Sequence, residues 1–195
     1  VAIGFADKVF YTSPFAFAAR YKKAIQMPVG IDMEIFRYLP AITKKPNSIL
    51  YLGRISPIKK LEVLIEAAKM LLERGVDFSI SIVGAPSKLS EEAYAGKIKE
   101  KSELLIRSGR VSFLVPVPNY KAPELYNSHE LSVNMTPSGS FDKAIIESMA
   151  CETPVIVSNE SLRGTLPEEL IFEDGNANDL AIKIENFTKL PVSER

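Results

Sequence analysis

Two basic residues and a glycine lie in the segment 52–60, between an apolar run and a helical pattern. Gly53 lets a ligand approach the backbone, and the start of the next helix offers free N–H groups and the positive end of its dipole. Arg54 can donate two parallel hydrogen bonds to an oxyanion, and Lys59 adds a point charge. The segment therefore predicts a phosphate site. The alternative is a solvated basic loop, which describes most exposed Lys and Arg residues and fits Lys60.

A second polar loop, at 136–143, opens a helix that carries a carboxylate among apolar residues. Glu147 follows Ile146 and precedes Met149. A buried carboxylate without donors is costly, so Glu147 should find hydrogen-bond donors. Two interpretations stay open: a structural carboxylate satisfied by a backbone group or a lysine, and an acceptor for two sugar hydroxyls in a cleft.

The elements around both loops alternate between strand and helix. Apolar runs predict strands at 49–52, 78–83, 111–115, 131–135, 154–157 and 170–172, and helical spacing predicts helices at 61–72, 90–109, 122–126, 142–151 and 178–188. This rhythm indicates an α/β fold, a Rossmann-like doubly wound and mostly parallel sheet of about six strands with helices on both faces. Both loops then lie beyond strand carboxyl ends, where such sheets bind ligands. Before Ile49 we expect a strand at 8–12, a helix at 14–23 and a linker.

The composition excludes several classes of function. Lys plus Arg equals Asp plus Glu at 24 each, so no overall field favours nucleic acid. Neither GxGxxG nor GxxxxGK[ST] occurs. His129 and Cys151 are single residues of their kind, so we predict no metal site, a packing role for His129 and a buried, inert thiol. No apolar run reaches the roughly 20 residues of a membrane span, and the single cysteine favours the cytoplasm.

Several short motifs follow one another in a distinctive order. They are Pro28–Asp32 followed by Phe36, Leu52-Gly53-Arg54 with Lys59 five residues later, Ile82–Gly84, Pro137-Ser138, Ile146–Cys151 and Thr153–Ser158. Their order and spacing resemble the C-terminal domain of the group 4 retaining glycosyltransferases, also described as group 1 glycosyl transferases. In that family two Rossmann-like domains face each other in the GT-B fold, and the C-terminal domain holds the nucleotide of an activated sugar.

The resemblance implies a role for each candidate residue. Arg54 and Lys59 would be the catalytic residues, because they contact the diphosphate and stabilise it electrostatically as it leaves. Glu147 would accept hydrogen bonds from the ribose hydroxyls, and the base would lie near Val115, Pro116 and Val117. The other substrate-binding residues would be Gly53, Gly84, Ser138, Gly139, Ser140, Phe141, Asp142, Lys143 and Ala144.

The implied activity is transfer of a sugar with retained configuration from a UDP-, GDP- or ADP-sugar, with no cofactor and no metal. Residues 25–195 would form the donor-binding domain, and residues 1–24 the tail of the N-terminal acceptor domain or a linker. An acceptor of unknown kind, a saccharide, a lipid or a small molecule, would be bound mainly by that other domain. The fragment alone should bind and not transfer. We expect a cytoplasmic protein, and a peripheral position of the full-length protein at the membrane stays open.

One position departs from the family pattern. The family has a glutamate eight residues before Glu147, and Gly139 stands there. Asp142 in the same loop is our candidate to replace that contact with the sugar. Two other functions stay open: a sugar-nucleotide epimerase of the same architecture, and a degenerate, non-catalytic nucleotide-binding module.

Overall fold

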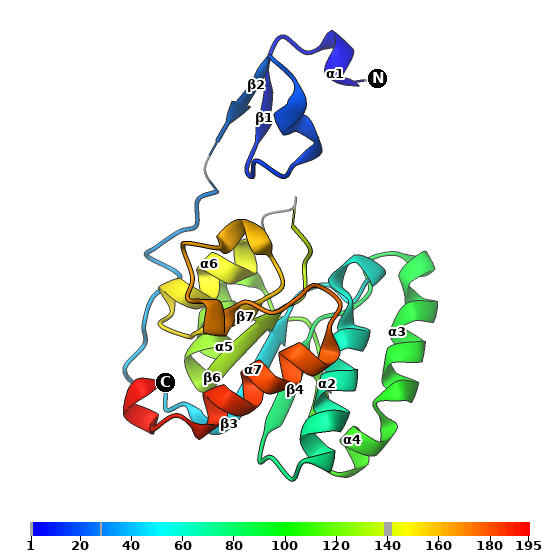
Figure 1. Cartoon of the computed structure of the whole chain (residues 1–195), viewed down its shortest axis with the longest axis vertical. Helices are drawn as coiled ribbons and strands as arrows, with labels where there is room; N and C mark the ends of the chain where they lie inside the picture. The colour runs from blue at the N-terminus through cyan, green and yellow to red at the C-terminus, as the bar shows by residue number, and fades with distance from the viewer. Residues whose placement is uncertain (1, 28, 139–141) are drawn as a thin grey trace.

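The computed structural model describes residues 2–27, 29–138 and 142–195 of the chain, and its centre is a parallel sheet (Figure 1). Within these residues the sheet has five strands, β3 (Lys45–Leu52), β4 (Ser79–Val83), β5 (Val111–Leu114), β6 (His129–Asn134) and β7 (Val155–Val157). Their order across the sheet is β5-β4-β3-β6-β7, and every neighbouring pair is parallel. Strands β4 and β5 thus extend the sheet on one side of β3, and β6 and β7 then extend it on the other side. The switch point, where such sheets bind ligands, lies between β3 and β6.

Helices cover both faces of the sheet, which confirms the α/β, doubly wound class. They are α2 (Leu61–Glu73), α3 (Leu89–Lys101), α4 (Glu103–Arg107), α5 (Ala122–Ser128), α6 (Lys143–Ala150) and α7 (Ala177–Lys189). Side chains of α2, α3 and α7 share one large core with Ile49 and Tyr51, whereas Leu50 packs on the opposite face with Tyr126 of α5. Because both faces are covered, the second half of β3, from Ile49 to Leu52, is a continuous apolar run instead of alternating with polar residues.

The helix α2 shows how the sequence sets an element that positions the site. It begins after Lys60, which has a left-handed backbone, and its apolar residues recur at helical spacing toward the core. Gly75 ends it with a φ of 71°, a conformation that glycine adopts without steric cost. The start of α2 is thereby fixed directly after the basic loop.

Three elements expected from the sequence differ from the structure. The predicted helix at 90–109 is divided at Ser102 into α3 and α4. The predicted strand at 170–172 is reduced to a single bridge between Ile171 and Val157, because a 3₁₀ turn at Glu168–Leu170 occupies its first residue. The predicted helix at 14–23 is only a 3₁₀ turn, Phe17–Arg20, in which the Arg20 guanidinium lies 3.4 Å from the centre of the Phe17 ring.

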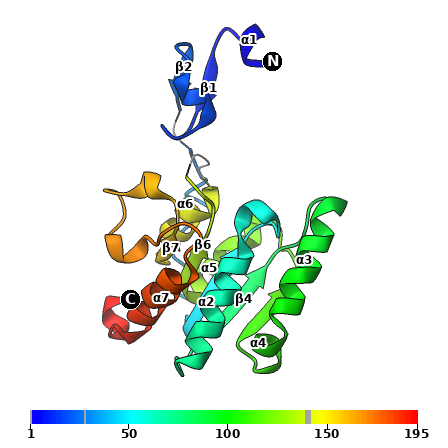
Figure 2. The same cartoon turned by 45° about the vertical axis from the view of Figure 1, so that its right-hand side comes forward.

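The N-terminal segment forms a small unit apart from the sheet. Strand β1 (Val9–Tyr11) pairs in parallel with β2 (Ala24–Gln26), and a short helix α1 (Ala2–Phe5) precedes them. Figures 1 and 2 show this pair standing away from the five-stranded sheet, joined to it by an extended segment. The boundary that we predicted after residue 24 falls inside β2. Among the described residues, no helix combines the length and the apolar character that a bilayer span requires.

Candidate functional site

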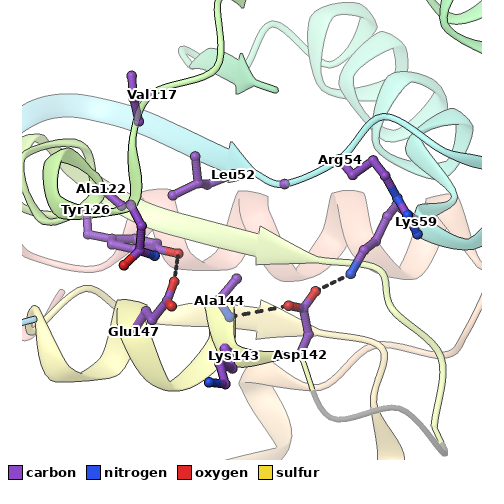
Figure 3. Close-up of a pocket in the computed structure, with 12 residues that line it drawn as sticks. Leu52, Arg54, Lys59, Val117, Ala122, Tyr126, Asp142, Lys143, Ala144 and Glu147 are labelled. Atoms are coloured by element: carbon purple, nitrogen blue, oxygen red, sulfur yellow. Dashed lines mark hydrogen bonds and ion pairs between the residues drawn. The ribbon is translucent and has the colours of Figure 1, made fainter. Parts of the chain in front are cut away.

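An open cavity of about 500 Å³ lies beyond the carboxyl end of β3, where α5 and α6 approach it (Figure 3). Eight of the residues that the sequence singled out line it: Gly53, Arg54, Lys59, Val117, Asp142, Lys143, Ala144 and Glu147. Four further residues complete the lining: Leu52, Asn119, Ala122 and Tyr126. The structure therefore brings the basic loop and the glutamate helix to one site.

The backbone of the basic loop is held against the loop that follows β4. The Gly53 N–H donates to the Val83 carbonyl over 3.1 Å, and the Ile55 N–H donates to the Ala85 carbonyl over 3.1 Å. A Cβ added at Gly84 would lie 1.9 Å from the Gly53 carbonyl oxygen, so only glycine fits there. A Cβ at Gly53 would meet the Tyr51 hydroxyl at 3.4 Å, an ordinary contact. Packing within the protein thus requires Gly84, and it leaves Gly53 free to admit a ligand.

Lys59 is held by two residues, one that follows the neighbouring strand β6 and one at the start of α6. Its Nζ lies 2.5 Å from Asp142 Oδ2 and donates to Thr136 Oγ1 over 3.0 Å. The same carboxylate oxygen accepts hydrogen bonds from Thr136 Oγ1 and Asn134 Nδ2, each over 2.9 Å. Because Asn134 ends β6 and Thr136 follows it, the network joins both strands of the switch point.

Asp142 also caps α6. Its Oδ1 accepts from the Ala144 N–H over 3.3 Å, so both oxygens of the carboxylate are engaged (Figure 3). Burial raises the pKa of Asp142, but the charge of Lys59 and the hydrogen bonds that the carboxylate accepts outweigh it, so the pKa lies below its usual value. This arrangement favours a structural role for Asp142 over the sugar contact that we expected.

The Arg54 side chain makes longer polar contacts than the Lys59 side chain does. Its Nε lies 3.7 Å from Glu91 Oε1, and its Nη1 donates to Ser87 Oγ over 3.3 Å. The side chain is 43% exposed. The backbone is better fixed, because the hydroxyl of Tyr51, buried beneath the loop, donates to the Arg54 carbonyl over 2.8 Å. The guanidinium can therefore exchange a long ion pair for a phosphate at little cost.

Glu147 lies at the opposite end of the cavity from Lys59, on the second turn of α6. Glu147 is only 9% exposed, and its Oε2 accepts a hydrogen bond from the Tyr126 hydroxyl over 3.2 Å. Burial raises the pKa of Glu147, although the hydrogen bond from Tyr126 works against that shift. The donor that the sequence called for is thus a tyrosine, and the carboxylate faces the cavity with acceptor capacity left for a ligand.

The remaining candidates lie elsewhere. Gly84, Val115 and Pro116 line a neighbouring cavity of about 500 Å³ against α3, and of the predicted base site only Val117 lines the first cavity. The hydroxyl of Ser138 accepts from the Glu160 N–H over 2.9 Å. Pro28, Gly139, Ser140 and Phe141 lie outside the described residues.

Two residues that we assigned no chemistry are integrated into the fold. The ring of His129 contacts the Leu125 carbonyl at 2.8 Å and Ser81 Oγ at 2.9 Å, and burial lowers its pKa. The Cys151 thiol is buried, and burial raises its pKa to about 11. In the described part of the chain, no group of three or more His, Cys, Asp or Glu residues is placed to hold a metal ion. Lys60 pairs with Asp174 over 2.6 Å, outside the cavity.

Sequence reasoning missed Asn134, Thr136 and Tyr126. A signal existed for the first two, because polar residues at the carboxyl end of a fully buried strand need partners, and that end is where a parallel sheet presents its site. Tyr126 gave no such signal, since a tyrosine at helical spacing usually belongs to a core.

Comparison with known sequences identifies the family. The family described as "Glycosyl transferases group 1" matches residues 32–195. A protein named D-inositol 3-phosphate glycosyltransferase from Rhodococcus opacus is 29% identical over 192 residues, which is 95% of this chain and 41% of the relative. A protein of the same name from Nocardia farcinica is 35% identical over 155 residues, which is 78% of this chain and 33% of the relative. The chain thus spans well under half the length of these relatives.

Solved structures share the fold. A sucrose-phosphate synthase from Thermosynechococcus elongatus superimposes with a TM-score of 0.78 at 24% identity, over 93% of this chain and 49% of that one. HepE from Anabaena, solved with UDP and glucose, gives a TM-score of 0.80 at 21% identity, over 96% of this chain and 55% of that one. The C-terminal domain of a group 1 glycosyl transferase from Francisella tularensis gives 0.69 at 17% identity, over 81% of this chain and 87% of that one. Family match and fold agree, and the chain belongs to the group 1 glycosyl transferases.

Proposed function

We propose that this chain is the donor-binding part of a retaining glycosyltransferase and that its cavity holds a nucleoside diphosphate sugar. The observation that carries the proposal is the separation of charge in the cavity: Arg54 and Lys59 line one end, and the carboxylate of Glu147 lines the other. A nucleoside diphosphate has the complementary pattern, with anionic phosphates at one end and ribose hydroxyl donors at the other.

The phosphate end is supplied with charge by three features. Arg54 and Lys59 come from the loop after β3, and the amino end of α6 directs its dipole to the same place. Gly53 adds backbone that a phosphate can approach, because it has no side chain to shield its peptide groups. The overall charge of the chain is zero, so the attraction is local to this cavity.

The ribose end is supplied by Glu147. The Tyr126 hydroxyl holds one oxygen of the carboxylate, which orients the group toward the cavity. Two vicinal hydroxyls match the two oxygens of a fixed carboxylate, and they would compensate the burial that raises its pKa.

Catalysis in this proposal is electrostatic. As the bond between the sugar and the diphosphate breaks, negative charge grows on the leaving phosphate, and fixed cations stabilise that charge more than they stabilise the bound donor. Arg54 and Lys59 are the groups that serve this purpose, without a metal ion. Losing one fixed donor of this kind costs about 3 kcal/mol of barrier.

The acceptor would be bound mainly by parts of the protein outside this chain. Relatives that align with most of the chain are named as D-inositol 3-phosphate glycosyltransferases. Inositol 3-phosphate is therefore the first acceptor to test with the full-length protein, and analysis of the product separates transfer with retention from epimerisation of the donor.

Isothermal titration of the chain with UDP, GDP and ADP in the presence of EDTA tests the proposal. We expect one of the three to bind, and Arg54→Ala or Glu147→Ala to weaken that binding at least tenfold. Lys60→Ala is the matched control, because Lys60 belongs to the same loop and its ion pair with Asp174 lies outside the cavity. Absence of binding by all three nucleotides would refute the proposal and favour a degenerate module.

A further inference from the structure

We infer that Asp142 is a positioning residue, which together with Thr136 and Asn134 holds the Lys59 ammonium so that one N–H bond stays directed to the diphosphate. The inference rests on the proposed function and assigns the residue that prepares the cation of that site. It replaces the direct contact between Asp142 and the sugar that the sequence led us to expect.

The first argument is the count of donors on Lys59. An ammonium has three N–H bonds. One is directed to Asp142 Oδ2 at 2.5 Å and one to Thr136 Oγ1 at 3.0 Å. Because the Lys59 side chain is only 18% exposed and lines the cavity, the third bond is the one available to a ligand there. A lysine is otherwise a flexible point charge, and two fixed partners remove that freedom before the ligand arrives.

The second argument is the count of acceptors on Asp142. Its Oδ2 accepts from Lys59, Thr136 and Asn134, and its Oδ1 accepts from the Ala144 N–H. Oδ2 is thereby saturated, and Oδ1 keeps about one of its two lone-pair sites. Little capacity is left for a sugar hydroxyl, whereas Glu147 accepts hydrogen bonds from the Tyr126 hydroxyl and the Asn119 side chain and keeps about two lone-pair sites for a ligand.

The third argument is that two buried residues, Asn134 and Thr136, fix the position of Asp142. Asn134 Oδ1 accepts from the Thr136 N–H over 3.0 Å, so the amide is oriented with its Nδ2 toward Asp142. Thr136 is 2% exposed and Asn134 is 4% exposed. Both therefore act from beneath Asp142, without a place in the cavity lining, and their effect on a ligand must pass through Asp142 and Lys59.

Thr136→Val tests the inference, because valine keeps the shape and removes the hydroxyl that joins Lys59 to Asp142. The ligands are UDP and UDP-glucose, or the corresponding pair of the base that the unaltered chain binds. We expect both ligands to bind on the order of tenfold more weakly, by the same factor. In a Lys59→Met background, Thr136→Val should change the affinity less than twofold. Thr188→Val is the matched control, since its hydroxyl donates to the Glu185 carbonyl on α7.

Asp142→Asn provides the second variant. An amide has one oxygen, so it cannot accept from both Lys59 and the Ala144 N–H, and its effect on both ligands should again vanish in the Lys59→Met background. An effect confined to UDP-glucose, or one that persists without Lys59, would show a direct contact with the sugar and overturn the inference. Thermal unfolding of each variant verifies that the fold is intact.

A measurement without nucleotide separates this inference from the proposed function. Acetylation of the free chain, followed by mass spectrometry, reports how far Lys59 is engaged, with the exposed Lys97 as internal reference. We expect Lys59 to react several-fold faster after Thr136→Val or Asp142→Asn. Unchanged reactivity refutes the positioning role, whereas lack of nucleotide binding by the unaltered chain refutes the proposed function.

Discussion

Replacing Gly84 by alanine should destabilise the whole sheet, although the change adds a single methyl group. The new Cβ would lie 1.9 Å from the Gly53 carbonyl oxygen and 2.9 Å from the Gly53 carbonyl carbon, so the two loops would have to separate by more than 1 Å. Two hydrogen bonds between the loops resist that movement, those donated by the Gly53 and Ile55 N–H groups to the Val83 and Ala85 carbonyls, and the Gly84 N–H is itself bound to the Leu114 carbonyl of β5. A Gly84 φ of 153° adds backbone strain for any residue with a side chain.

The expected cost follows from these two terms. Overpacking in a rigid environment costs about 1–3 kcal/mol, and an unfavourable φ costs a further ~1–3 kcal/mol. A loss of about 4 kcal/mol is a large part of the roughly 5–15 kcal/mol that stabilises a typical domain. At about 2–4 °C per kcal/mol for a chain of this size, the unfolding temperature should fall by about 10 °C.

Circular dichroism during thermal and urea unfolding measures this, since the chain has no tryptophan for fluorescence. Gly53→Ala is the matched control: its Cβ meets the Tyr51 hydroxyl at 3.4 Å, so its stability should change little while nucleotide binding weakens. The reasoning is refuted if Gly84→Ala unfolds within 2 °C of Gly53→Ala, a difference below about 1 kcal/mol.

Three further predictions concern buried ionisable groups. Glu147 has a raised pKa, so the stability that it contributes is complete below its unfolded pKa and is lost as the pH rises through its folded pKa. Urea titrations should therefore show Glu147→Gln gaining stability relative to the unaltered chain as the pH rises above about 4, the usual value for Glu, and a constant difference would contradict this. The Cys151 thiol, buried with a pKa of about 11, should react with a disulfide reagent at neutral pH only as fast as the chain opens, and immediate reaction of the folded chain would argue against its burial. Arg195→Met should cost about 3 kcal/mol in urea unfolding, because it leaves Glu130 buried without the guanidinium that lies 2.9 Å away, and a cost below about 1 kcal/mol would show that solvent replaces the pair.

Most of the fold could be predicted from the sequence, because strands, helices and helix ends are marked by patterns within short segments. Apolar runs and helical spacing predict each of the five strands and the α/β class, and glycines such as Gly75 mark helix ends. The short segments were mispredicted for the same reason. Three apolar residues at 170–172 carry too little pattern to tell a strand from a turn, and the contacts of Arg20 with the Phe17 and Tyr21 rings are not visible as a periodicity.

The charged residues of the candidate site could be predicted from the sequence, but the hydrogen bonds between them could not. Arg54, Lys59 and Glu147 are conspicuous by type and place, and the structure brings them to one cavity. The engagement of Asp142 depends on residues that meet only in three dimensions, so its two oxygens looked free in the sequence. The same holds for Gly84, which must lack a side chain because the backbone of Gly53 lies against it, at the end of the adjacent strand and 31 positions earlier in the chain.

The ion pair between Lys59 and Asp142 has a consequence for how this chain assembles. The two residues are 83 positions apart, and they follow β3 and β6, the strands on either side of the switch point. The binding cavity therefore forms only after β6 has paired with β3. A chain in which only β3, β4 and β5 have assembled has Arg54 and Lys59 in place, but it lacks Asp142, α6 and the carboxylate of Glu147. A bound nucleotide is then a reporter of completed folding: at a hundred times its dissociation constant it would add about 2.7 kcal/mol to the stability of the finished sheet and nothing to a partly built one.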